Sequence, residues 1–210
     1  MTSKPNFNLI ARPYRWLEYL TLGHALERCR LHFLPNLLDQ KRALVIGDGD
    51  GRFLAALMAA NHHLRADAVD TSATMLKLLT KRCEASADRL KTHQTNALAF
   101  VPVGNYDLVV THFFLDCLTQ PQLEALIACI SPVLAPGAIW LISDFSIPSG
   151  PMHLPARFVV RSLYFGFRIL TGLRTTCLPN YATPLTKTGL TRKAHHRSLV
   201  GLLTTELWQI

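Results

Sequence analysis

The hydrophobic pattern of the chain is clearest over residues 43–60. Four consecutive apolar residues, Ala43–Ile46, predict a strand that is buried on both faces, as strands of parallel sheets are. Three glycines follow at every second position, Gly47, Gly49 and Gly51, and a second apolar run from residue 53 predicts a helix. A strand that turns through glycines into a helix brings backbone N–H groups and a helix N-terminus against a ligand. The pattern therefore predicts a ligand-binding loop at residues 47–51.

Strands and helices are expected to alternate along the rest of the chain. A helix is predicted within residues 7–34, ended by Pro35. Further strands are predicted to end at Asp70 and to span 90–95, 107–110 and 138–143, with helices over 75–83, 121–134, 157–170 and 179–186. Two closing strands, 193–199 and 202–208, are typical of an antiparallel hairpin. This alternation predicts a single α/β domain. The 210 residues are enough for one such domain but too few for two.

The glycine loop is chemically unlike a phosphate-binding loop. The dinucleotide fingerprint needs a third glycine where this chain has Arg52, and no Gly-Lys-Ser/Thr follows as a P-loop requires. Asp48 and Asp50 lie inside the loop, where two carboxylates would repel a pyrophosphate. A cationic cofactor without phosphates, such as S-adenosyl-L-methionine with its sulfonium, suits the loop better. Asp70, at the end of the second strand and 19 residues after Gly51, could accept hydrogen bonds from both hydroxyls of a ribose.

These motifs together resemble the class I S-adenosylmethionine-dependent methyltransferases. The matching segments are Gly47–Gly51, Val69–Leu76, Thr95–Ala97, Tyr106–Val110 and Leu134–Ala138. The resemblance implies a Rossmann-like seven-stranded sheet in the order 3-2-1-4-5-7-6, with only the last strand antiparallel and helices on both faces. The opening Asn8-Leu-Ile-Ala-Arg-Pro-Tyr14 is similar to small-molecule methyltransferases of the ubiquinone/menaquinone-biosynthesis type. Residues 1–40 would then be a helical cap, 41–145 the cofactor-binding core, and 146–210 the substrate-side helices and hairpin.

The resemblance also implies a set of cofactor-binding residues. These are Tyr14, Gly47, Asp48, Gly49, Gly51, Asp70, Thr71, Met75, Asn96, Ala97, Thr111 and His112. Two departures from the family pattern weaken it: Asn96 replaces the commoner aspartate, and Val45 stands where many members have an acid. An amide oxygen at residue 96 could still accept a hydrogen bond from the adenine amino group. Tyr14 and Met75 have the alternative roles of pinning the first helix onto the sheet and of filling the core.

Three candidate catalytic residues follow the fourth and fifth strands, whose carboxyl ends line the ligand crevice in such a sheet. His112 is a candidate general base because its free pKa lies near neutrality. Asp116 could orient that imidazole or accept a proton, and Asp144 could bind a substrate hydroxyl or act as the base. Alternatively, His112 only lines the cofactor site, and Asp116 is the N-cap of a short turn. The neighbouring histidine pairs at 62–63 and 195–196 lack partners at metal spacing, so no metal is expected.

The charge of the chain is unevenly placed. Of a net charge of +8, residues 151–210 contribute eight Lys/Arg against a single acid, Glu206, while residues 43–150 hold seven Lys/Arg against ten acids. The basic end is suited to an anionic partner: a membrane surface, an acidic carrier protein, an anionic substrate or RNA. Solvated surface arginines are the alternative.

Composition also bounds the compartment. The five cysteines, an odd number without a C-x-x-C pair, favour reduced thiols. Residues 1–9 contain no apolar segment of a signal peptide, and no apolar run reaches the ~18 residues of a membrane span. A cytoplasmic protein is therefore expected, of undetermined oligomeric state.

The sequence favours a methyltransferase acting by O- or C-methylation on a small, largely apolar or aromatic acceptor. The acceptor is expected between the first helix, with Tyr14 and Trp16, and residues 147–175, where Phe158, Tyr164, Phe165 and Phe167 cluster. Alternatives are a non-catalytic protein that keeps the cofactor as a structural or sensory ligand, and a methyltransferase of RNA or protein. A DNA partner is not expected, and a short-chain dehydrogenase would need a Tyr-x-x-x-Lys that the chain lacks.

Overall fold

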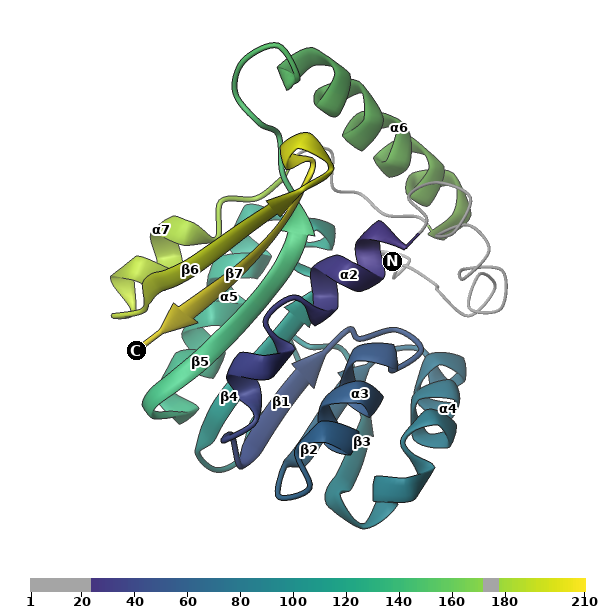
Figure 1. Ribbon diagram of the computed structural model, residues 1–210, viewed down its shortest axis with the longest axis vertical. Coiled ribbons are helices and arrows are strands. Elements are labelled where there is room, and N and C mark those ends of the chain that lie inside the picture. The colour runs from purple at the N-terminus through teal and green to yellow at the C-terminus, as the bar shows by residue number, and fades with distance from the viewer. Residues whose placement is uncertain (1–23, 172–177) are drawn as a thin grey trace.

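A seven-stranded sheet forms the centre of the protein in the computed structural model (Figure 1). The structure describes residues 24–171 and 178–210, and in the helix His153–Thr171 (α6) it describes side chains as far as Ser162. The strand order is β3-β2-β1-β4-β5-β7-β6, as predicted. β7 pairs antiparallel with β5 and β6, and the remaining pairs are parallel. The strands are β1 Arg42–Ile46, β2 Arg65–Asp70, β3 Leu90–Gln94, β4 Tyr106–His112, β5 Leu134–Phe145, β6 Thr191–Ser198 and β7 Leu203–Gln209.

Helices cover both faces of the sheet. They are α2 Ala25–Leu31, α3 Arg52–Ala60, α4 Ala73–Arg82, α5 Gln120–Ile130, α6 His153–Thr171 and α7 Ala182–Lys187. One core cluster packs α3 and Leu79 of α4 against one face, and another packs α5 and α7 against the opposite face. The central strands are buried on both sides because alternate side chains, such as Leu44 and Val45, point into different clusters. Because every strand except β7 runs in the same direction, the carboxyl ends of these strands lie at one edge of the sheet.

Two segments extend this edge. α2 packs against β7 through Ala25, Leu26, Cys29 and Leu203, so it lies across the sheet near the carboxyl ends of the strands. The first helix was predicted to end at Pro35, but α2 stops earlier, at Leu31, and Pro35 lies inside the 3₁₀ turn Leu34–Leu37. α6 follows the carboxyl end of β5. Among the helices that the structure describes, none is long and apolar enough to cross a membrane.

Candidate active site at the carboxyl edge of the sheet

The glycine loop joins the carboxyl end of β1 to α3. All three of its glycines have positive φ, 71° at Gly47, 60° at Gly49 and 79° at Gly51, a region that other residues rarely adopt. A Cβ at Gly51 would lie 2.8 Å from the Cα of Leu79, and one at Gly47 would lie 2.6 Å from the Phe114 ring. At Gly49 a Cβ would meet nothing within 4 Å. Two glycines therefore let the loop pack, and Gly49 leaves its backbone open to a ligand.

The two aspartates of the loop have different surroundings. Asp50 forms ion pairs with Arg52 at 2.9 Å and with Arg82 of α4 at 2.7 Å. Asp48 is buried, and its Oδ2 accepts the backbone N–H of Leu54 at 3.0 Å. Its Oδ1 is buried without a hydrogen-bond partner among the described residues. Burial raises the pKa of Asp48 to about 7, against the opposing effects of the Leu54 hydrogen bond and the Arg30 charge. Of the two aspartates, Asp48 is therefore the one with a buried oxygen left unpaired for a cationic group.

The acidic end of β2 has the predicted position. Asp70 Oδ1 accepts the backbone N–H of Ser72 at 2.8 Å, and burial raises the pKa of the carboxyl to about 6. The Ser72 hydroxyl caps α4 by accepting the N–H of Met75, whose side chain is buried, while Thr71 is exposed. The hydrogen bond from Ser72 thus fixes the orientation of the Asp70 carboxyl at the end of β2.

Three further residues predicted to bind the cofactor, Asn96, Ala97 and Thr111, have different surroundings. Asn96 Oδ1 accepts the N–H of Leu98 at 2.8 Å, which leaves its second lone pair for a ligand. Ala97 is buried in the core cluster beside α5. Thr111 is fully buried, and its hydroxyl accepts the indole N–H of Trp140 at 3.1 Å. The described contacts of Thr111 are therefore structural, and its role toward a cofactor stays a prediction.

His112, the last residue of β4, is buried in contact with an aromatic neighbour. Its ring meets Phe53 edge-on, with centroids 4.4 Å apart, and in the described part of the chain neither ring nitrogen has a hydrogen-bond partner. Burial, followed by the charge of Arg30, holds its pKa well below the usual range. A neutral imidazole of low pKa is a weak general base, so His112 is better suited to hydrogen bonding than to proton abstraction.

Asp116 and Asp144 form a buried pair where β4 and β5 end. Asp144 Oδ2 accepts the N–H of Asp116 at 3.1 Å, and its Oδ1 accepts the N–H of Phe145 at 2.8 Å. Burial raises the pKa of Asp116 to about 6, and burial together with the Asp116 charge raises that of Asp144 well above its ordinary value. Carboxyl groups with raised pKa values are suited to accept or hold a proton near neutral pH. Of the three predicted catalytic residues, Asp116 and Asp144 are therefore better suited to accept a proton than His112 is.

The structure adds residues that the sequence analysis missed. Arg30 of α2 is buried, and its guanidinium lies 5.1 Å from the centroid of the Phe113 ring. Phe113 follows β4 with a φ of 51°, a strained conformation of the kind that is concentrated at functional sites. A helical signal could have found Arg30, because it shares a face with Leu26 and Cys29, whereas Arg28 does not. For Phe113 the sequence carries no such signal.

Two predicted features of the acceptor side have different outcomes. Tyr14 and Trp16 lie outside the described residues. Phe158 was expected in the acceptor pocket, but its side chain is exposed, because α6 packs inward through Ala156 and Val160 instead. That prediction is wrong for Phe158.

In the described part of the chain, no group of three or more His, Cys, Asp or Glu side chains could hold a metal ion.

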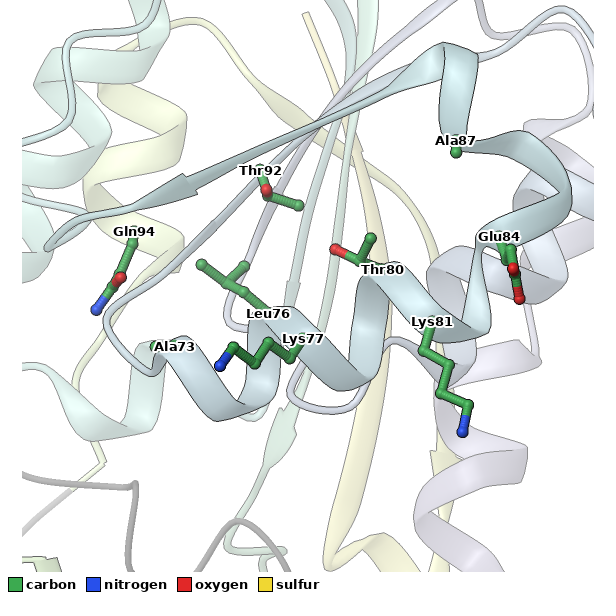
Figure 2. A pocket seen from close by; sticks show the side chains of 9 residues that line it. All are labelled: Ala73, Leu76, Lys77, Thr80, Lys81, Glu84, Ala87, Thr92 and Gln94. Carbon is green, nitrogen blue, oxygen red and sulfur yellow. The ribbon is translucent and has the colours of Figure 1, made fainter.

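A surface groove of about 640 Å³ lies between α4 and the edge strand β3 (Figure 2). Lys77, Thr80 and Lys81 of α4 line it together with Thr92 and Gln94 of β3. None of the residues predicted for the site lines this groove. It is therefore distinct from the carboxyl edge that carries the glycine loop.

Comparison with known proteins bears on the carboxyl edge. Residues 44–140 match the family model described as a methyltransferase domain. This segment is therefore similar in sequence to methyltransferase domains. It includes the glycine loop, Asp70, Asn96, His112 and Asp116, so the predicted resemblance is confirmed for the segment that holds most of the site. A comparison with curated proteins by sequence gives no match.

Solved methyltransferase structures share the fold. The N-methyltransferase NodS from Bradyrhizobium japonicum WM9, in complex with S-adenosyl-L-homocysteine, has a TM-score of 0.64 at 18% identity over 88% of this chain and 87% of its own. An O-methyltransferase family 2 protein from Planctomyces limnophilus DSM 3776, in complex with apigenin, has a TM-score of 0.69 at 19% identity over 93% of this chain. The mitomycin 7-O-methyltransferase MmcR has a TM-score of 0.69 at 16% identity over 97%. This chain spans 61% and 60% of those two O-methyltransferases.

Proposed function

We propose that this protein is a methyltransferase that uses S-adenosyl-L-methionine to methylate a small, largely apolar or aromatic acceptor on oxygen or carbon. The observation that carries the proposal is the methyltransferase-domain match over residues 44–140, which contains an open glycine loop at the carboxyl edge. The structures of NodS with S-adenosyl-L-homocysteine and of the Planctomyces protein with apigenin support a sulfur cofactor and a small acceptor.

The residues at this edge fit the cofactor. The backbone around Gly49 is open to close approach, and the Asp70 carboxylate can accept hydrogen bonds from a ribose. The unpartnered Oδ1 of Asp48 is an acceptor for an ammonium. The buried guanidinium of Arg30 lies close enough to oppose the rise in the pKa of Asp48 and to add to the fall in the pKa of His112. We assign Arg30 to the carboxylate of the cofactor's amino-acid end, because its guanidinium lies near Asp48 and His112 at this edge and guanidinium–carboxylate pairs are strong.

When bound, the cofactor supplies an electrophilic methyl carbon, and the protein's task is to hold an acceptor atom in line with it. Asp144 lies at the end of β5 and Asp116 in the turn that follows β4, and this pair could hold a hydroxyl or accept its proton. Phe113 and Phe145, whose ring centroids are 5.3 Å apart, supply apolar surface beside that pair. Apolar walls with a few polar groups are typical of small-molecule sites.

Isothermal titration calorimetry tests the cofactor assignment. We expect binding of S-adenosyl-L-methionine and S-adenosyl-L-homocysteine, and no binding of NADH, because the loop lacks the chemistry of a pyrophosphate site. Turnover is then followed as S-adenosyl-L-homocysteine production in the presence of candidate phenols. Affinity for NADH with none for the sulfur compounds would refute the cofactor. Cofactor binding without turnover of any small acceptor would favour a sensory or structural role.

A matched pair of arginines on α2 tests the amino-acid end. We expect Arg30→Met to weaken S-adenosyl-L-homocysteine binding by about 10–100-fold, the value of a charged hydrogen-bonded pair. Binding of 5′-methylthioadenosine, which lacks the amino-acid end, should change less than about threefold. Arg28→Met is the control, because Arg28 is exposed on the same helix. Equal losses for both ligands would mean that Arg30 is structural only.

A further inference from the structure

Six exposed apolar side chains belong to the first half of α6, the loop before it and the β6–β7 turn. We call them the apical patch: Ile147, Met152, Leu154, Phe158, Leu199 and Val200. Leu154, Phe158 and Val200 expose 72%, 74% and 72% of their surface. Figure 1 shows α6 and the β6–β7 turn at the same end of the molecule. Concentrated apolar exposure of this kind marks an interaction surface, whereas single exposed apolar residues are ordinary.

The turn, the loop before α6 and the helix itself form one packed unit. Ser146 donates its hydroxyl to the carbonyl of Gly201 and its N–H to that of Leu202, both at 2.8 Å. Val160, on the inner face of α6, packs against Leu202 and Phe145. The apical patch therefore lies on the outside of a fixed arrangement rather than on separate loops.

The outer face of α6 combines apolar and basic residues. Leu154, Arg157, Phe158 and Arg161 are three, one and three positions apart, so they lie on one face of the helix, and all four are exposed. Residues 145–205 contain no Asp or Glu at all. A helix face that mixes exposed apolar and cationic side chains is typical of helices that lie in the headgroup region of an anionic membrane. An acidic carrier protein would complement the charge alone.

The backbone of the β6–β7 turn supports a functional reading. Leu199 and Val200 have φ values of 47° and 54°, which non-glycine residues rarely adopt and β-branched residues least of all. Strain of this kind persists where the surrounding structure enforces it, commonly at functional sites. Here it holds Val200 out in solvent, where its side chain gains nothing from folding.

We propose that the apical patch is a docking surface for anionic lipid bilayers. Leu154, Phe158 and Val200 enter the headgroup region, and Arg157 and Arg161 contact lipid phosphates. The docking does not depend on the methyltransferase activity. Because the loop at residues 146–152 continues directly from β5 and Asp144, docking places the carboxyl edge of the sheet next to the membrane.

Co-sedimentation of the full chain with vesicles tests the proposal. We expect the protein to bind phosphatidylcholine vesicles that contain phosphatidylglycerol and not those of phosphatidylcholine alone. Reversing both charges, Arg157→Glu with Arg161→Glu, should lower the partition coefficient at least about 30-fold. Phe158→Ser should lower it about tenfold. The matched controls are Lys77→Glu with Lys81→Glu on α4, which have the same spacing, and Val101→Ser at an equally exposed valine.

Val200→Asn separates docking from folding. Asparagine tolerates a positive φ, so the thermal midpoint should stay the same or rise while vesicle binding falls by about threefold or more. A wild-type protein that leaves anionic vesicles unbound overturns the proposal, as do equal losses in the patch and control variants. Capture of an acidic protein through the same residues, with vesicles unbound, would assign the patch to a protein partner and overturn it too.

Discussion

Gly49→Arg is expected to weaken binding of S-adenosyl-L-homocysteine by at least about 100-fold, equivalent to about 2.7 kcal/mol. The loop backbone at Gly49 is open, so an arginine there fits without displacing a neighbour and fills the space that a ligand would need. Its charge would also repel the ammonium of the cofactor's amino-acid end. Calorimetry measures the affinity, and circular dichroism checks that the fold is intact.

Gly137→Arg is the matched control for this substitution. Gly137 also has a positive φ, 77°, and a Cβ there would likewise meet nothing within 4 Å, but it lies in β5 away from the loop. Both variants should therefore bear a similar strain of about 1–2 kcal/mol, while only the first loses cofactor affinity. Undiminished binding by Gly49→Arg would remove the glycine loop from the cofactor site.

Asp144→Ala is expected to lower the free energy of unfolding by about 1–3 kcal/mol, because the backbone N–H groups of Asp116 and Phe145 lose their acceptors. Asp144→Asn keeps one oxygen, which can still accept the N–H of Asp116, and should cost less. Urea unfolding of the wild type and both variants between pH 5 and pH 8 measures the difference. If the two variants lose equal stability, the hydrogen bond to Asp116 is not what Asp144 contributes.

The same series carries a pH dependence of defined sign. The folded-state pKa of Asp144 is raised by burial and by Asp116, so the group stabilises the fold when protonated, and that contribution is lost as pH rises through the folded pKa. Asp144→Asn cannot lose a proton. We therefore expect its stability relative to the wild type to improve from pH 5 to pH 8, by at least about 1.4 kcal/mol for each unit of pKa shift titrated in that window. A constant difference would show that the carboxyl is ionised throughout.

The sequence by itself determined the scaffold of this site. Strands buried on both faces must be apolar at consecutive positions, so Ala43–Ile46 could be recognised as β1 without its neighbours. The alternating glycines specified a loop of positive φ. Ser72 caps α4 by accepting the N–H of Met75, a local hydrogen bond between residues three positions apart. The sheet order followed from the resemblance to the methyltransferases, and the structure confirms it.

Only the tertiary structure decided which of several like residues has chemistry available. Asp48 and Asp50 are two positions apart, and the sequence does not distinguish their roles. In the structure Arg82, 32 residues away, pairs with Asp50, while Asp48 is buried and accepts the N–H of Leu54 in α3. Likewise Arg30 is buried and Arg28 exposed, and Phe158 lies in solvent because α6 packs through Ala156 and Val160. Partners and pKa values depend on burial and on contacts distant in the chain, and local pattern carries neither.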